Sequence, residues 1–207
     1  MDGAHVVKGG WLLVLEGLDG CGKSTQLEPL AGALRACGRD VLVTREPTDG
    51  AWGRRIRELA RSGTRAEPEE ELRWFERDRR EHVDALIAPA LTAGRVVLCD
   101  RYWLSTVAYQ GARGLDWRKI LERSEAEFPL PDLVLLLEID PEVGLARVRG
   151  RGAGAGDAFE RADYLARVAA IFAAVDRPYV ARIDAGAAAD VVRAAALDCI
   201  RERLALL

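Results

Sequence analysis

A short segment near the N-terminus combines glycines, a lysine and hydroxyl side chains in the order that phosphate-binding loops require. The segment GLDGCGKST (17–25) follows the apolar run WLLVL and precedes a sequence compatible with a helix. It fits the pattern G-x-x-x-x-G-K-[ST], in which glycines let backbone N–H groups point at phosphate oxygens. The pattern predicts that Lys23 contacts the terminal phosphates of a nucleotide and that Ser24 holds Mg²⁺. The expected phosphate-binding residues are Gly17, Asp19, Gly20, Cys21, Gly22, Lys23, Ser24 and Thr25.

Two arginines follow two other apolar runs, each where a strand is expected to end. Arg45 lies in TREPTDG (44–50), and Arg101 lies in LCDRY (98–102), directly after Asp100. Guanidinium groups on neighbouring strand ends can converge on one dianion, each through a planar fork of donors. Because the phosphate loop already serves one nucleotide, the two arginines indicate a second phosphate on an acceptor; the alternative is a pair of surface ion pairs. Asp100 is the natural partner for Mg²⁺ or its waters.

Aromatic and polar side chains recur at helical spacing in two further segments. Phe75 and Arg79 are four residues apart and hence share a helical face, where a ring can stack on a base and a guanidinium can donate to its edge. Taken alone, this stretch is more typical of a core aromatic residue beside an exposed arginine. Ser105 and Tyr109 also share a face, and Gln110 follows them.

Apolar runs of strand length alternate with longer helical patterns along the whole chain. The runs are continuous, as expected for strands that are covered on both faces. This alternation predicts one α/β domain over residues 1–207, a three-layer fold with a parallel sheet between two layers of helices. The expected strands span 11–17, 40–46, 95–100, 132–140 and 179–185, and the expected helices span roughly 23–37, 51–62, 67–93, 103–126, 141–150, 160–177 and 187–206.

Composition excludes several functional classes. A formal net charge of −3 argues against a general nucleic-acid or anionic-membrane binder. No apolar run approaches the roughly 20 residues of a membrane-spanning helix, and residues 1–10 lack the apolar core of a signal peptide. The four cysteines form neither a CxxC pair nor a cluster with histidine, which predicts reduced thiols in a cytoplasmic protein.

Together these segments resemble the thymidylate kinase family, over essentially the whole chain and in the right order. The matching segments are EGLDGCGKST, REPTDG, FERDR, DRYWLSTVAYQG, PDLVLLLEIDPEVGLAR and DAFE. The resemblance implies a P-loop kinase fold with a five-stranded parallel sheet in the order 2-3-1-4-5, and a homodimer. It further implies a transferase of nucleotide biosynthesis, which moves the γ-phosphoryl group of ATP to thymidine monophosphate (dTMP) with Mg²⁺ and yields dTDP.

The resemblance also implies an acceptor site. Phe75 would stack on thymine, and Arg79 would donate to thymine O4. Arg45 and Arg101 would grip the acceptor phosphate, and Asp19 would reach the acceptor sugar. The remaining wall of this site would consist of Ser105, Tyr109 and Gln110.

A Gly- and Ala-rich segment, about residues 149–160, is expected to form a lid. The resemblance implies that Arg149 and Arg151 close over ATP. The catalytic cations would then be Lys23, Arg101, Arg149 and Arg151, and the residues near Mg²⁺ or its waters would be Ser24, Asp100 and Glu160.

Three departures from the family pattern concern the loops. Ala158 stands where the lid commonly carries arginine, and Gly20 stands where some members carry arginine after the loop aspartate. The stabilising cation must therefore come from Arg149 or Arg151. The segment REPTDG replaces the commoner REPGGT, which we expect to reshape the loop and leave Arg45 in position.

Two other functions remain open on the sequence. One is another P-loop nucleotide or nucleoside kinase, for which the REP and AYQG segments would be coincidental. The other is a non-catalytic nucleotide-binding paralogue, which the altered lid makes conceivable. A GTPase-like switch is disfavoured because the chain has no N-K-x-D guanine-recognition signature.

Base selectivity follows from the chemistry of Arg79, which can only donate hydrogen bonds. Cytosine presents a donor where thymine presents O4, a mismatch of about 1–3 kcal/mol in a buried site. The thymine methyl group is worth about 1–3 kcal/mol against uracil. In steady-state assays we expect strong rejection of dCMP and partial acceptance of dUMP. Equal turnover of dCMP and dTMP would remove Arg79 from this role.

Overall fold

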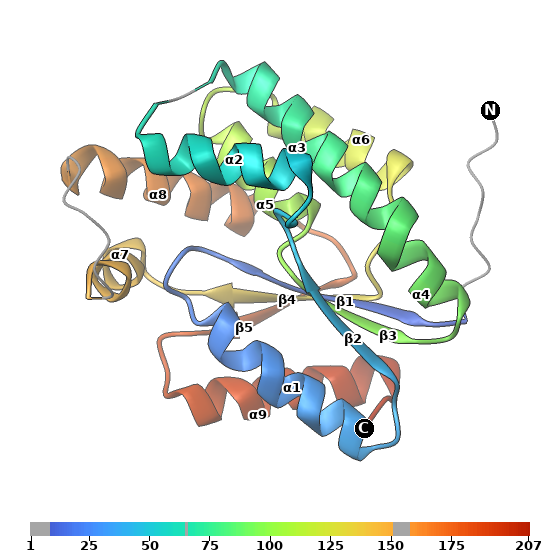
Figure 1. Ribbon diagram of the computed structural model, residues 1–207. Helices are drawn as coiled ribbons and strands as arrows, with labels where there is room; N and C mark the ends of the chain where they lie inside the picture. The colour runs from blue at the N-terminus through green and yellow to red at the C-terminus, as the bar shows by residue number, and fades with distance from the viewer. Residues whose placement is uncertain (1–8, 65, 151–157) are drawn as a thin grey trace.

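A single parallel sheet forms the centre of the computed structural model (Figure 1), which describes residues 9–64, 66–150 and 158–207, with the backbone alone for 158–161. The five strands run in the order β2-β3-β1-β4-β5, as expected. They lie within two residues of the ranges predicted from the apolar runs. Their bounds are β1 (Trp11–Gly17), β2 (Val41–Arg45), β3 (Val96–Asp100), β4 (Leu133–Glu138) and β5 (Val180–Asp184).

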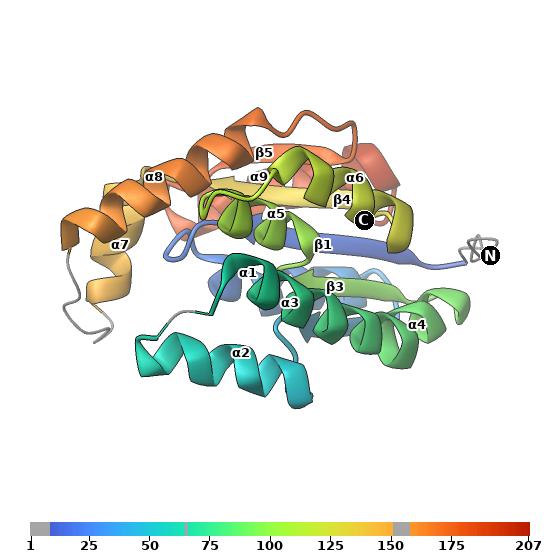
Figure 2. The same cartoon turned by 90° about the horizontal axis from the view of Figure 1, so that it is seen from above.

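Helices cover both faces of the sheet. Below the sheet in Figure 1 lie α1 (Lys23–Ala36) and α9 (Ala189–Leu204). The opposite face, seen from above in Figure 2, carries the larger group of helices, with α2 packed on the outer side of α3. This group comprises α2 (Ala51–Ser62), α3 (Pro68–His82), α4 (Ala88–Thr92), α5 (Trp103–Gly111), α6 (Trp117–Glu127) and α8 (Ala158–Ala174), while α7 (Pro141–Arg149) lies at the end of the sheet beside α8.

The central strand β1 shows why continuous apolar runs predicted this arrangement. Leu12 and Val14 belong to the hydrophobic core on the α5 side, whereas Leu13 and Leu15 belong to the core on the α1 side. All four side chains are fully buried. Successive side chains of a strand point to opposite faces, so a strand with helices above and below must be apolar at every position.

Two of the expected helices are interrupted. The range 67–93 contains a π-helical turn, Val83–Ile87, between α3 and α4. Pro89 lacks a backbone N–H and its ring crowds the preceding turn, which favours a wider turn there. The range 103–126 divides into α5 and α6, because Gly114 adopts a left-handed conformation (φ 103°) and the side chain of Asp116 caps α6 by accepting from backbone N–H groups.

The expected lid, residues 149–160, is only partly described. Its first residue, Arg149, ends α7, and Ala158 begins α8, whereas residues 151–157 lie outside the described residues. Among the helices that the structure describes, none has the length and apolar character needed to cross a bilayer.

A pair of glycine substitutions tests the packing of α2 on the loop after β2. A Cβ atom on Gly53 would lie 1.9 Å from the carbonyl oxygen of Thr48, whereas one on Gly32, in α1, meets nothing within 4 Å. We expect Gly53→Ala to lower the free energy of unfolding by about 1–3 kcal/mol. Gly32→Ala should instead raise it by roughly 0.5–1 kcal/mol, because alanine favours helix. Urea unfolding of both variants measures the difference, and equal effects would contradict the close packing.

Candidate functional site

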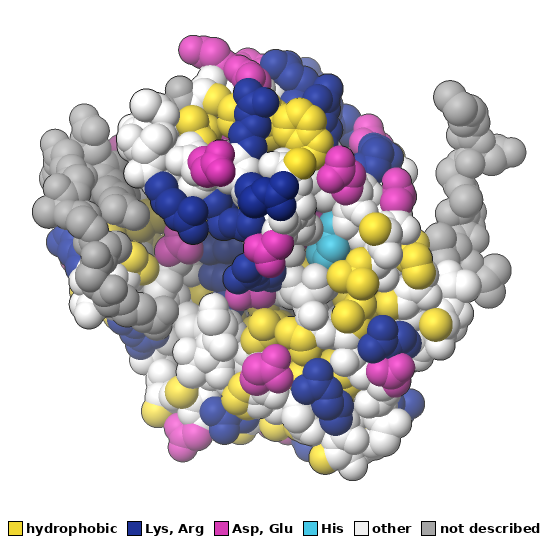
Figure 3. All heavy atoms as spheres, in the orientation of Figure 1, with side chains coloured by type: hydrophobic (Ala, Val, Ile, Leu, Met, Phe, Trp, Pro, Cys, Tyr) yellow, Lys and Arg dark blue, Asp and Glu magenta, His cyan; other side chains and the backbone are white. Residues whose placement is uncertain are grey.

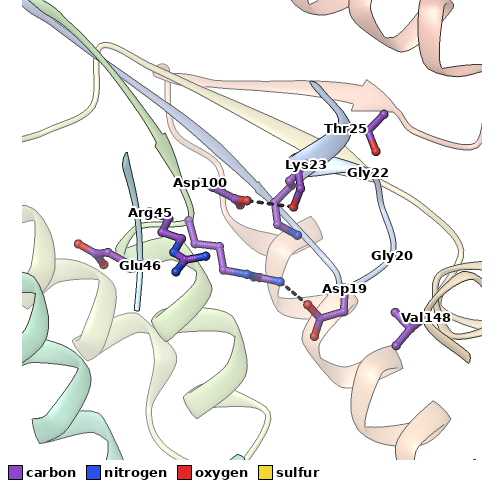
Figure 4. Close-up of a pocket in the computed structure, with 11 residues that line it drawn as sticks. Asp19, Gly20, Gly22, Lys23, Thr25, Arg45, Glu46, Asp100 and Val148 are labelled. Carbon is purple, nitrogen blue, oxygen red and sulfur yellow. Dashed lines mark hydrogen bonds and ion pairs between the residues drawn. The ribbon is translucent and has the colours of Figure 1, made fainter. Parts of the chain in front are cut away.

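One cavity of about 310 Å³ lies at the carboxyl ends of β1, β2 and β3. Figure 3 shows Lys and Arg side chains gathered in a hollow of this face, and Figure 4 shows the residues that line the cavity. The cavity thus brings the phosphate loop and both strand-end arginines together. The lining residues are Asp19, Gly20, Gly22, Lys23, Ser24, Thr25, Arg45, Glu46, Asp100, Arg101 and Val148.

The phosphate loop depends on glycine for its conformation. Gly17, Gly20 and Gly22 all have positive φ (133°, 85° and 99°), where other residues are strained. A Cβ atom on Gly20 would also lie 2.2 Å from the carbonyl oxygen of Gly144, in α7. Gly22 precedes α1, and no side chain among the described residues caps the start of that helix. Its first N–H groups therefore have no side-chain acceptor and are suited to phosphate oxygens.

Lys23 lies across the loop and is buried. Its Nζ atom donates to the carbonyl oxygens of Gly17 (3.0 Å) and Leu18 (2.9 Å). Burial lowers the pKa of Lys23, and the nearby Arg101 cation lowers it further. A phosphate group in the loop would supply the opposite charge that favours the ammonium form.

Arg101 occupies a left-handed conformation (φ 69°) directly after β3. Its Nη2 atom pairs with Asp19 Oδ1 at 2.7 Å, and its Nη1 atom donates to Ser105 Oγ at 2.6 Å. The Tyr109 ring lies 5.3 Å from the guanidinium carbon. Desolvation alone would raise the pKa of Asp19, but the charges of Arg101 and Lys23 hold it below its usual value. Asp19 therefore stays ionised and anchors the arginine.

Arg45 reaches the same cavity from the end of β2 (Figure 4). Its Nη2 atom contacts both carboxylate oxygens of Asp49, at 2.9 and 3.1 Å. Arg57 contacts the same carboxylate at 2.8 Å. The loop that carries Asp49 is fixed by Thr48, whose backbone N–H and hydroxyl group both donate to the buried carboxylate of Asp78. The segment TDG therefore presents a carboxylate to Arg45, and that arginine lines the cavity.

Oxygen ligands suitable for Mg²⁺ lie between the loop and β3. Ser24 Oγ donates to Asp100 Oδ2 at 3.3 Å. The other carboxylate oxygen, Asp100 Oδ1, is buried and has no hydrogen-bond partner among the described residues. A hydroxyl oxygen beside an unpartnered carboxylate oxygen fits a hard cation such as Mg²⁺. The side chain of Glu160, the third expected metal-site residue, lies outside the described residues.

Neither Phe75 nor Arg79, the two residues expected to bind the base, lines the cavity. Phe75 is half-buried, and Arg79 is buried between the rings of Tyr102 and Phe128. Arg79 Nη1 and the Oε1 atom of Gln110 have no hydrogen-bond partner among the described residues. An unpaired donor in α3 and an unpaired acceptor in α5 are thus both buried, and Arg79 also donates to Thr106, four residues before Gln110 in α5.

Only one of the two expected lid arginines lies among the described residues. Arg149 is exposed at the end of α7, one residue after Val148, which lines the cavity. Arg151 lies outside the described residues.

Several residues that matter at the site were not predicted from the sequence. Glu46 pairs with Arg79 (2.9 Å) and contacts His82 Nδ1 (3.0 Å), and Thr106 accepts from Arg79 Nη2 at 2.8 Å. Glu16, the one charge within the run WLLVLEG, is fully buried and contacts α5. A single charge within an apolar run could have singled out Glu16. No pattern in the neighbouring sequence indicates that Glu46 and Thr106 contact Arg79.

A second hollow of about 310 Å³ borders the outer side of the phosphate loop. Arg147 borders it, and its Nη1 atom donates to the carbonyl oxygen of Ala185 at 3.1 Å. The other lining residues are Gly20, Cys21, Gly22, Thr25, Gln26, Ala185, Ala187, Ala188, Ala189 and Val192. This location, next to the loop and apart from the two arginines, suits the remainder of a nucleotide whose phosphates lie in the loop.

The fold and the site define a P-loop kinase that acts on a phosphorylated acceptor, because a phosphate loop and a second arginine-lined phosphate position share one cavity. A sequence model of the family described as thymidylate kinase matches residues 15–195. A thymidylate kinase of Xanthomonas euvesicatoria is 50% identical over 184 residues, which cover 89% of this chain and 80% of that protein. One of Desulfotalea psychrophila is 48% identical over 185 residues, 89% of this chain and 91% of that protein. The chain belongs to the thymidylate kinase family.

Substitution of loop glycines tests the contact between the phosphate loop and α7. Gly20 and Gly38 both have positive φ, but only a Cβ atom on Gly20 would meet backbone atoms within 4 Å. We expect Gly20→Ala to weaken binding of a non-hydrolysable ATP analogue at least about tenfold, because the loop must shift away from Gly144. Gly38→Ala should cost stability of the order of 1 kcal/mol through strain and leave binding unchanged. Calorimetric titration measures both, and matched affinities would exclude the contact as a constraint on binding.

Proposed function

We propose that the cavity holds the γ-phosphate of ATP and the phosphate of dTMP side by side, so that the phosphoryl group passes between them. The chain is a dTMP kinase, which phosphorylates dTMP to dTDP, as its family and its relatives indicate. The observation that carries the proposal is a single cavity lined by Lys23 and the loop on one side and by Arg45 and Arg101 on the other.

The donor side neutralises the triphosphate. The uncapped N-terminus of α1 and the curled loop offer backbone N–H groups, and Lys23 exchanges its carbonyl contacts for phosphate oxygens. Ser24 and Asp100 would hold Mg²⁺, directly or through its waters. When bound, Mg²⁺ supplies two further positive charges against the phosphate oxygens.

On the acceptor side, the nucleophile is an oxygen of the dTMP phosphate. The second pKa of a phosphate monoester is about 6, so dTMP is mostly dianionic at neutral pH and needs no strong general base. Arg101 and Arg45 bind this dianion, and each turns part of its guanidinium away from a carboxylate, Asp19 or Asp49, to do so. Charge balance at both phosphates removes the repulsion that otherwise keeps two polyanions apart.

The buried unpaired atoms support recognition of thymine. Arg79 Nη1 is a donor and Gln110 Oε1 is an acceptor. Thymine offers the complementary pair, the acceptor O4 beside the donor N3–H. An unpaired buried polar atom costs about 1–3 kcal/mol, so a base that pairs both atoms is favoured over one that pairs neither. Phe75, half-buried in the same helix as Arg79, supplies the stacking surface.

The proposal retains three parts of the sequence prediction. Arg149 and Arg151 supply the cation that closes over ATP, and Glu160 lies near the metal or the sugar. The active assembly is a homodimer in the cytoplasm.

An acceptor-panel assay with arginine variants tests the proposal. ADP release is measured with ATP and dTMP, dUMP, dCMP or thymidine. We expect turnover with dTMP, and Arg45→Met should raise the KM for dTMP about 10- to 100-fold, the worth of a charge-assisted hydrogen bond, with little change in the KM for ATP. Arg118→Met is the matched control, since that arginine stacks on Trp117 away from the cavity.

Two outcomes would contradict the proposal. Binding of ATP without ADP release would favour the non-catalytic alternative. Faster turnover of another acceptor than of dTMP would favour a different nucleotide or nucleoside kinase.

A further inference from the structure

A buried carboxylate lies directly beneath the site. Glu16 is the penultimate residue of β1, which ends at Gly17, and its side chain is 0% exposed. An ionised carboxylate is costly to bury unless it is hydrogen-bonded, so a glutamate in the central strand of the sheet calls for a specific set of partners.

The partners of Glu16 all lie at the start of α5. Its Oε1 atom accepts the backbone N–H groups of Tyr102 (2.9 Å) and Ser105 (3.0 Å), and its Oε2 atom accepts the hydroxyl of Ser105 (2.5 Å). Tyr102 is the N-cap residue of α5 and makes no side-chain cap. From a neighbouring strand, Glu16 therefore satisfies two of the four N–H groups that the start of a helix leaves unpaired, and its side chain lies at the favourable end of the helix dipole.

The same contacts determine the direction of the next hydrogen bond. Ser105 has a single hydroxyl proton, which it donates to Glu16. Its lone pairs are then left to accept from Arg101 Nη1, at 2.6 Å. The other end of the guanidinium binds Asp19, so Arg101 is held between a carboxylate in the loop and a hydroxyl whose orientation Glu16 fixes.

We propose that Glu16 is a positioning residue for the acceptor phosphate: through Ser105 and the first turn of α5 it holds Arg101 toward the cavity, opposite Lys23. This role rests on the proposed function of Arg101. Burial raises the pKa of Glu16, while the charge of Arg101 and the hydrogen bonds from Ser105 and Tyr102 oppose that rise. The pKa of Glu16 is raised overall, and the hydrogen bonds that hold its side chain come from the groups that it orients. Because β1 continues directly into the phosphate loop, Glu16 also fixes the position of Arg101 relative to that loop.

The test compares Glu16→Gln, Ser105→Ala and the double variant. Glutamine keeps the volume of Glu16 but replaces one acceptor oxygen with a donor. For Glu16→Gln we expect the KM for dTMP to rise at least about tenfold and kcat to fall, with the affinity for a non-hydrolysable ATP analogue changed less than about twofold. A purely structural role would not separate the two substrates. Glu138→Gln makes the same chemical change at the end of the neighbouring strand β4, on a partly exposed side chain, and should leave both constants unchanged.

The double variant tests whether Glu16 acts through Ser105. If it does, Glu16→Gln should cost much less in the Ser105→Ala background than in the wild type, because the shared contact is already lost. Ser105→Thr, which retains the hydroxyl group, should keep most of the affinity for dTMP. Thermal unfolding of each variant identifies loss of folding. If Glu16→Gln does not fold, Ser105→Ala alone should still raise the KM for dTMP and spare the ATP analogue.

Other outcomes would overturn the inference. Equal loss of ATP and dTMP affinity, additive effects in the double variant, or unchanged kinetics of Glu16→Gln would each show that Glu16 does not position Arg101. Failure of the proposed function is visible separately, in the wild type. If the wild type binds no dTMP in calorimetric titration, both proposals are wrong. If it binds and phosphorylates dTMP, the variants test the role of Glu16 alone.

Discussion

Concentration of positive charge at one edge of the sheet is the constraint on which the rest of the site depends. Lys23, Arg45 and Arg101 reach one cavity from the ends of three neighbouring strands. Like charges so close repel, and the structure offsets this with partners that phosphate can replace. Carboxylates bind the two arginines, and carbonyl oxygens bind the lysine. Three cations are thereby held at one cavity, each with a partner that an anionic ligand can replace.

A second layer of buried acids lies behind the arginines. Glu16 acts on Arg101 through Ser105, and Glu46 pairs directly with Arg79. Both glutamates are at or next to the carboxyl end of a strand and are almost completely buried. An arginine side chain has many rotamers. A hydrogen bond from one guanidinium nitrogen to a buried carboxylate or hydroxyl fixes the orientation of the other nitrogens before a ligand binds. The precision of the site thus derives from the sheet and not from the loops alone.

The sequence was sufficient to predict most of the fold, and it singled out the loop and the two arginines that line the cavity. Continuous apolar runs define buried parallel strands, and glycine spacing defines the phosphate loop, because both signals are local. The partners of Glu16 and Arg79 lie 27–89 positions away in the chain, so only the folded sheet reveals them. Pro89 and Gly114 are residue types that interrupt helices, but the helical periodicity around them led to the prediction of continuous helices. The lid and the single-domain organisation stay predictions.

The ion pair between Arg45 and Asp49 has a consequence for how the acceptor enters. Both side chains are largely exposed, and such a pair is worth at most about 1 kcal/mol, so it yields readily to a dianion. On the proposed function, the acceptor phosphate would replace Asp49 at Arg45, while Asp49 keeps its second partner, Arg57. Chloride, which carries a single charge, gains less than a phosphate dianion by displacing Asp49 and is therefore the weaker competitor at Arg45.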